Sequence, residues 1–143
     1  MTDVFCLPFN LIDPDLMTQE KIHPANWRKL VNLGLVLVPA TSDQVLTVAS
    51  INNGNPGLSF YDAAALELAN RVGCKLLTDD KYLKKIAGNY QVEVRGVTWL
   101  LNEMADNACL PGDAAFAALC LIHQKGHAIN ASEMNLWKKQ WAK

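Results

Sequence analysis

The sequence lacks the features that mark several large classes of protein. Its longest uninterrupted apolar runs are Leu35–Pro39 and Ala114–Ile122, well short of the roughly 18–20 residues that cross a bilayer. The first residues contain no basic segment of the kind that opens a signal peptide, so we expect a cytoplasmic protein without a membrane association. No G-x-G-x-x-G or G-x-x-x-x-G-K-[ST] loop occurs, which argues against a small-ligand fold built on phosphate binding.

An excess of positive charge is also missing. The formal net charge is −1 at pH 7, and the isoelectric point is near 6.3. Proteins that coat nucleic acid without specificity are usually strongly basic, because their affinity comes from neutralising phosphates. Any contact with nucleic acid must therefore be local.

Cysteines are few and form no recognisable motif. The four are scattered, with no C-x-x-C pair and no histidine at zinc-ligand spacing. We therefore expect reduced, buried cysteines that behave as small apolar residues. They are Cys6, Cys74, Cys109 and Cys120.

The composition is that of one folded domain. The chain has 143 residues, of which 50% are hydrophobic and 19% charged, and it contains no repeat or linker. This is enough apolar material for a core at the usual size of a domain, so we expect a single domain spanning residues 1–143.

Short apolar runs alternate with helical patterns along the chain. Clear strands are expected at 35–38, 74–77 and 91–94, and residues 9–12 are a further candidate. The segment Asp13-Pro14-Asp15 has the form of a helix start, which predicts a helix from Pro14 to about Ile22. Strands separated by helices favour parallel pairing, and hence an α/β fold. Helices are expected at 24–33, 41–52, 59–71, 80–87, 97–105, 111–124 and 131–142.

Acidic residues gather where such a fold places ligands, beyond the carboxyl ends of its strands. Thr78, Asp79 and Asp80 follow one strand directly, and Asp62 lies in the first turn of the preceding helix. In a parallel sheet the start of that helix and the end of that strand lie toward the same rim. Neighbouring carboxylates share a proton or bind a hard cation, and Mg²⁺ or Mn²⁺ suits oxygen ligands.

Helix capping explains the same residues without a metal. Ser59 and Asp62 have the spacing of a capping box, as do Thr41 and Gln44. Asp79 or Asp80 can cap the helix that follows. The two interpretations are compatible, since a carboxylate at a helix start can do both.

Three segments resemble one protein family. Residues 58–69 place an acid at the start of an Ala-rich helix, residues 74–83 give a short strand followed by Thr-Asp-Asp and a basic helix, and residues 92–101 give a last strand and its helix. Together they are similar to the second half of a PIN domain, the fold of the VapC toxins and related metal-dependent ribonucleases. The resemblance implies a three-layer sandwich in which helices flank a mainly parallel sheet.

The resemblance also implies a set of site residues. Asp62 and Asp80 match two of the family's metal-coordinating acids, with Thr78 beside the second and Asp79 as an extra acid in the same turn. A further family acid lies on an early helix, which nominates Glu20, although an isolated glutamate is ordinarily a solvated surface residue.

One family feature is missing. A PIN domain normally opens with a central strand ending in Asp-Thr-Asn, and on this alignment the chain begins after it. Either the sequence is truncated relative to its relatives, or the strand is lost and the sheet is rearranged. A third interpretation makes residues 9–12 the first strand, with Asp13 and Asp15 in the Asp-Thr-Asn place. Loss of a central strand leaves unpaired backbone groups and an apolar slot, so we expect a homodimer.

The function implied is that of an endoribonuclease of the toxin–antitoxin type, dependent on Mg²⁺ or Mn²⁺, with RNA as substrate and an antitoxin-like protein as partner. Lys81, Lys84 and Lys85 follow the acidic turn, where they can steer RNA phosphates or simply form a solvated helix face. The rival hypothesis is a catalytically inactive PIN-like module that binds RNA or a partner protein.

Overall fold

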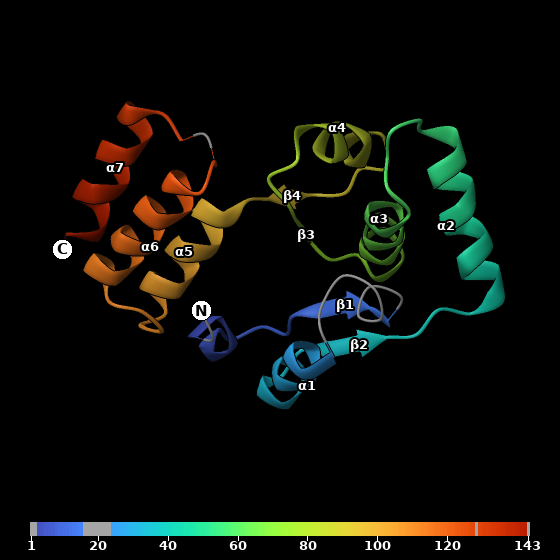
Figure 1. Cartoon of the computed structure of the whole chain (residues 1–143), viewed down its shortest axis with the longest axis horizontal. Helices are drawn as coiled ribbons and strands as arrows, with labels where there is room; N and C mark the ends of the chain where they lie inside the picture. The colour runs from blue at the N-terminus through green and yellow to red at the C-terminus, as the bar shows by residue number, and fades with distance from the viewer. Residues whose placement is uncertain (1–2, 16–23, 128, 143) are drawn as a thin grey trace. The chain divides into compact units, whose positions relative to one another are not determined.

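The computed structural model describes residues 3–15, 24–127 and 129–142 (Figure 1). Its contacts divide the chain into two compact units. One comprises Asn10–Val97, and the other combines Met1–Phe9 with Thr98–Lys143. Helices and short parallel strands occur together, so the predicted α/β class is confirmed. The expectation of a single domain stays a prediction, as does the PIN-like sandwich.

The unit Asn10–Val97 contains two separate pairs of parallel strands. β1 (Ile12–Pro14) pairs with β2 (Val36–Val38), and α1 (Pro24–Leu33) connects them. β3 (Leu76–Leu77) pairs with β4 (Val94–Arg95), and α4 (Lys81–Asn89) connects those. Each strand pair is thus a strand–helix–strand unit, as the alternating pattern predicted.

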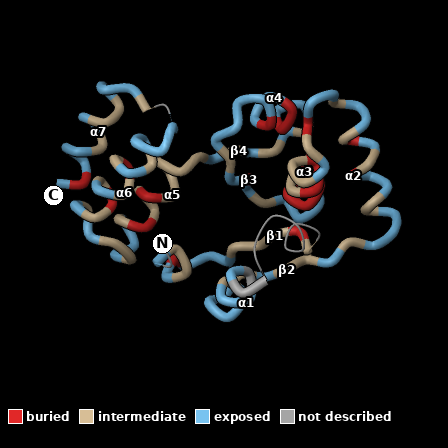
Figure 2. The backbone as a smooth tube through the Cα atoms, viewed as in Figure 1, coloured by how far each residue is buried: buried red, intermediate tan, exposed pale blue. Residues whose placement is uncertain are grey.

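Two helices join the strand pairs. α2 (Ser42–Gly54) and α3 (Phe60–Val72) pack against each other, and α3 also contacts both β1 and β3. The hydrophobic core of this unit centres on α3, where Figure 2 shows a concentration of buried residues. Leu66 is fully buried at its centre.

Local hydrogen bonds explain where these helices begin and end. Thr41 and Gln44 form the predicted capping box at the start of α2. The Ser59 hydroxyl accepts a hydrogen bond from the Asp62 backbone N–H at 3.0 Å, which caps α3. Gly73 ends α3 with φ of 76°, a left-handed conformation that glycine adopts without a steric penalty.

The predicted helix start at Pro14 is wrong, because β1 continues through this residue. Strand residues direct their backbone groups to alternate sides. The Leu11 carbonyl accepts a hydrogen bond from the Val36 N–H at 3.0 Å, so the Pro14 nitrogen, three residues on, points away from β2. A proline without an N–H is therefore tolerated at this position. The rest of that predicted helix, residues 16–23, lies outside the described residues.

The second unit is helical. A 3₁₀ turn, η1 (Asp3–Cys6), accompanies α5 (Val97–Asp106), α6 (Gly112–Gln124) and α7 (Ala131–Trp141). The Asn102 side-chain oxygen accepts hydrogen bonds from Gln140 and from the Trp141 indole, at 2.8 and 3.1 Å, which ties α5 to α7. This unit has its own apolar core, made of Leu7, Leu101, Met104, Ala115, Leu119 and Trp141.

Among the residues that the structure describes, no helix is long and apolar enough to cross a membrane.

Candidate functional site

The acidic turn after β3 is held by hydrogen bonds of its own. The Thr78 N–H donates to the Arg95 carbonyl at 2.9 Å, and the Thr78 hydroxyl accepts from the Asp80 N–H at 3.1 Å. One oxygen of Asp80 accepts from the Leu83 N–H at 2.7 Å, so Asp80 is the N-cap of α4. The capping interpretation of Asp80 is confirmed, and its second oxygen accepts no hydrogen bond from the residues that the structure describes.

Asp79 points to a different helix. Its two carboxylate oxygens accept from the backbone N–H of Val97, the first residue of α5, at 3.3 and 3.2 Å. A Cβ atom placed on the neighbouring Gly96 would strike this carboxylate, coming within 3.3 Å of its Cγ. Asp79 thus connects the end of β3 to the chain that follows β4.

Asp62 is half-buried, and in the described part of the chain its carboxylate accepts no hydrogen bond. It lies in the first turn of α3, where its backbone N–H is bonded to Ser59. A half-buried carboxylate at a helix N-terminus is favoured by the helix dipole and is available to a cation.

Asp13 is a further acid in the same unit. It lies in β1, opposite Leu37 of β2, and is half-buried. Burial raises the pKa of its carboxyl to about 6. The sequence placed Asp13 in the site only under the interpretation that makes the first apolar run the opening strand. The sequence signal for Asp13 is an acidic residue next to an apolar run that predicts a strand. Acids are unusual in such strands, because their residues are largely buried.

The described residues do not assemble a complete metal centre. Among the residues that the structure describes, no group of three or more His, Cys, Asp or Glu side chains is placed to hold a metal ion. The donor chemistry of Asp62 and Asp80 suits Mg²⁺ or Mn²⁺, but within the described ranges neither residue belongs to a group of three such ligands. Glu20, the third acid predicted from the sequence, lies outside the described residues.

The three lysines of α4 share one exposed side of that helix. Residues three and four positions apart lie on the same helix face, so Lys81, Lys84 and Lys85 form one group. All three are exposed, whereas Leu83 and Ile86 bury the opposite face. The Tyr82 hydroxyl donates to the Pro56 carbonyl at 2.6 Å and so fixes the start of α4 to the loop before α3. These lysines therefore belong to a fixed element that begins at the acidic turn.

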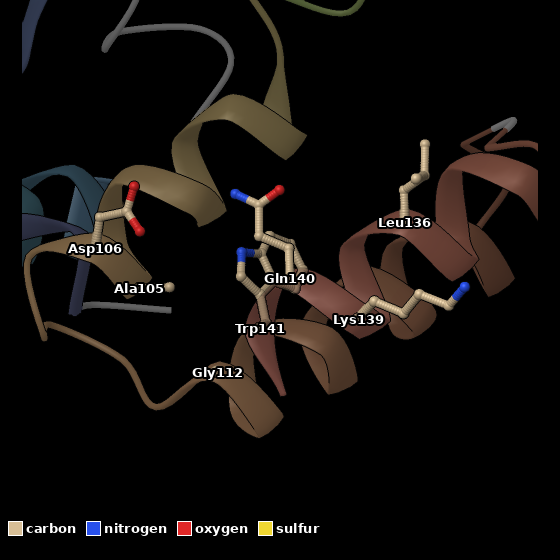
Figure 3. Close-up of a pocket in the computed structure, with 7 residues that line it drawn as sticks. All are labelled: Ala105, Asp106, Gly112, Leu136, Lys139, Gln140 and Trp141. Carbon is tan, nitrogen blue, oxygen red and sulfur yellow. The ribbon is translucent and has the colours of Figure 1, made fainter. Parts of the chain in front are cut away.

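A cavity of about 620 Å³ lies in the helical unit, lined by residues of α5, α6 and α7 (Figure 3). The close-up shows the Lys139 side chain extending away from Asp106, so the two opposite charges do not converge. Among the described residues, its lining includes one carboxylate and no histidine or cysteine. None of the predicted site residues that the structure describes is among the lining residues. The lining residues are Ala105, Asp106, Gly112, Leu136, Lys139, Gln140 and Trp141.

The cysteines are less buried than expected. Cys6 is exposed, and Cys74, Cys109 and Cys120 are half-buried, so the expectation of buried cysteines is wrong. Cys6 ends a surface 3₁₀ turn whose buried anchor is the next residue, Leu7.

Comparisons with protein-family models, with curated proteins and with solved structures find no match to this chain.

Proposed function

We propose that this chain is a PIN-like protein that hydrolyses RNA phosphodiester bonds with Mg²⁺ or Mn²⁺. The observation that carries the proposal is that two of the expected metal-binding acids lie at the starts of helices in the same unit. Asp80 is held after β3 by its hydrogen bond to the Leu83 N–H. Asp62 lies at the start of α3, the helix that packs against β1 and β3, and its carboxylate accepts no hydrogen bond from the described residues.

The strand arrangement supports the same proposal. β3 directs the N–H groups of Leu76 and Thr78 to β4, at 2.9 Å each, so the backbone groups of Leu77 point away from β4. In the described residues β3 has no strand on that side, and β1 has none opposite β2. If the central strand were removed from one parallel sheet, two strand pairs would remain, as β1–β2 and β3–β4 do here, with one helix, α3, in contact with both. Such an arrangement is what we would expect if the family's central strand were lost and the sheet rearranged, which is one of the interpretations left open by the sequence.

Each site residue has a separate role in the proposed reaction. Asp62 and Asp80, with Glu20, would hold the cation, and Thr78 keeps the turn that presents Asp80. A bound Mg²⁺ or Mn²⁺ supplies an activated water and neutralises charge on the scissile phosphate. Lys81, Lys84 and Lys85 draw RNA phosphates toward the acidic turn. An antitoxin-like partner and a homodimer remain predictions of the family resemblance.

Metal binding gives the first test. Titration of Mn²⁺ into the full chain by calorimetry is expected to show saturable binding that disappears in Asp62→Asn/Asp80→Asn. A matched control is Asp43→Asn, which also removes an acid from the first turn of a helix in the same unit, and it should bind as the wild type does. Absence of saturable binding in the folded wild type would rule out the metal-dependent reaction.

A second candidate is favoured by the incomplete cluster. Within the described ranges no three ligands come together, which fits a catalytically inactive PIN-like module that binds RNA. The lysines of α4 would then provide binding without chemistry. Cleavage of RNA that requires Mn²⁺ and is lost in Asp62→Asn/Asp80→Asn favours the nuclease, whereas binding that is unaffected by a chelator favours the module.

The contribution of α4 to RNA binding can be measured through its salt dependence. Each phosphate contact to single-stranded RNA adds about 0.7 to the slope of log affinity against log salt. Replacing Lys81, Lys84 and Lys85 with Gln should therefore weaken binding of a short single-stranded RNA and reduce that slope by about 2. The control replaces three exposed lysines of the helical unit, Lys125, Lys138 and Lys139. Equal losses in the two triple variants would show that α4 has no special role.

A further inference from the structure

Tyr82 differs from the other exposed aromatic side chains of the described residues. Phe9, Phe60 and Tyr82 are 38%, 36% and 41% exposed. The Phe9 ring stacks on Trp99 with centroids 6.0 Å apart, and the Phe60 ring meets Tyr61 edge-on at 6.4 Å. In the described part of the chain the Tyr82 ring contacts no second aromatic ring. Packing between rings therefore does not explain why an aromatic residue stands at this exposed position.

The Tyr82 ring is held in place although it is exposed. It lies in the first turn of α4, and its hydroxyl donates a hydrogen bond to the Pro56 carbonyl, 26 residues earlier, at 2.6 Å. Gly57, the next residue of that loop, lies beside the ring, since a Cβ there would come within 3.8 Å of the Tyr82 Cε1 atom. Because glycine has no side chain, it leaves this part of the ring uncovered. A ring whose conformation is already fixed loses little entropy when a ligand packs on it.

The side chains next to Tyr82 on α4 are positively charged. Lys81 precedes it, and Lys85 follows three residues later on the same helix face, and both are exposed. A ligand that matches this face combines negative charges with a flat, apolar surface. An acidic peptide would pair only with the lysines. A nucleic-acid strand offers phosphates to the lysines and a base to the ring.

We propose that one unpaired base of the bound RNA stacks on the Tyr82 ring while Lys81 and Lys85 contact the adjoining phosphates. The inference rests on the RNA binding proposed above and is independent of hydrolysis. Tyr82 follows Asp80 by two residues, so a nucleotide stacked there lies beside the acidic turn. The ring contributes binding and not proton transfer, because the hydroxyl already donates its proton to Pro56.

The test measures binding of RNA to the full chain in the presence of a chelator, which prevents metal-dependent hydrolysis. The probe is a short single-stranded oligouridylate that carries one fluorescent adenine analogue. Tyr82→Leu and Tyr82→Phe both lose the hydrogen bond to Pro56, but only Tyr82→Phe keeps an aromatic ring. We expect Tyr82→Phe to bind nearly as the wild type does and Tyr82→Leu to bind about 5- to 100-fold more weakly, the range for loss of one stacked base.

Salt dependence and base pairing distinguish stacking from charge. Tyr82→Leu should keep the wild-type slope of log affinity against log salt, because it removes no phosphate contact. It should bind the same strand in a duplex as the wild type does, because paired bases are not available to the ring. Stacking quenches the adenine analogue, so wild type and Tyr82→Phe should quench it at saturation and Tyr82→Leu should not. The control Phe9→Leu, which removes an exposed ring of the helical unit, should bind as the wild type does.

The outcomes separate this inference from the proposed function. If the wild type does not bind the single strand at low salt, RNA binding itself is overturned, and the proposed function with it. If the wild type binds, but Tyr82→Leu and Tyr82→Phe bind equally well, only the stacking role of Tyr82 is overturned. Equal weakening by Phe9→Leu and Tyr82→Leu, or a lower salt slope in Tyr82→Leu, would overturn that role in the same way.

Discussion

At the scale of single residues, the burial of Asp13 changes the pKa of its carboxyl. It is half-buried in β1, and burial raises its pKa to about 6, whereas an aspartate in an unfolded chain titrates near about 3.9. Between these two values the folded protein binds more protons at Asp13 than the unfolded chain does. The contribution of Asp13 to the free energy of unfolding therefore falls as the pH rises from about 4 to about 6, and it is constant above that range.

Replacement of Asp13 by Asn should remove this dependence. Relative to the wild type, we expect Asp13→Asn to gain about 1 kcal/mol of stability between pH 4 and pH 7, a figure reduced for the partial exposure of the side chain. Urea unfolding of both proteins across this range measures the difference. Parallel stability curves would contradict the burial of the Asp13 carboxyl in β1.

At the scale of elements, the connection between β3 and α5 depends on a close approach at Gly96. A side chain there would collide with the Asp79 carboxylate that accepts from the Val97 N–H. We expect Gly96→Ala to lower the free energy of unfolding by about 1–2 kcal/mol, through steric overlap and through loss of the contact to α5. Chemical denaturation measures this loss.

Gly88 offers a matched control for that substitution. It lies in α4, and a Cβ there would meet no atom within 4 Å. Gly88→Ala should therefore raise stability by up to about 1 kcal/mol through helix propensity. Combining Gly96→Ala with Asp79→Ala should cost less than the sum of the two single changes, because both disturb one contact. Strictly additive effects would show that Gly96 and Asp79 act separately.

At the scale of the whole molecule, the chain has two apolar cores that belong to different units. Leu66 is fully buried in the core around α3, and Leu119 is fully buried among α5, α6 and α7. Truncation of either to alanine should cost about 2–5 kcal/mol, through lost burial and the cavity left behind. The effect on amide exchange should be confined to the unit that carries the substitution.

Hydrogen exchange followed by mass spectrometry separates the two cases. Leu66→Ala should increase exchange in residues 10–97, and Leu119→Ala should increase it in residues 98–142. Loss of protection in both units from either substitution would indicate one cooperative domain, which is what the length and composition of the sequence predict.

The candidate site shows how far sequence reasoning reaches. The positions of Asp62 and Asp80 at helix starts were predicted and are confirmed, because capping involves backbone groups only three residues away. The contact of Asp79 with Val97 was not predicted, because it joins residues brought together by the pairing of β3 with β4. The metal-binding role of these acids stays a prediction.

The boundaries of α2, α3 and α4 are what this sequence determines by itself. The capping box at Thr41 and the left-handed Gly73 act through hydrogen bonds and dihedral angles within one turn, so the sequence pattern was sufficient. The continuation of β1 through Pro14, the burial of Asp13 and the contact of Asp79 with Val97 were decided by the tertiary structure. Each depends on a partner distant in the chain, and local propensity carries no information about which distant segment will supply a strand, a covering side chain or a hydrogen-bond partner.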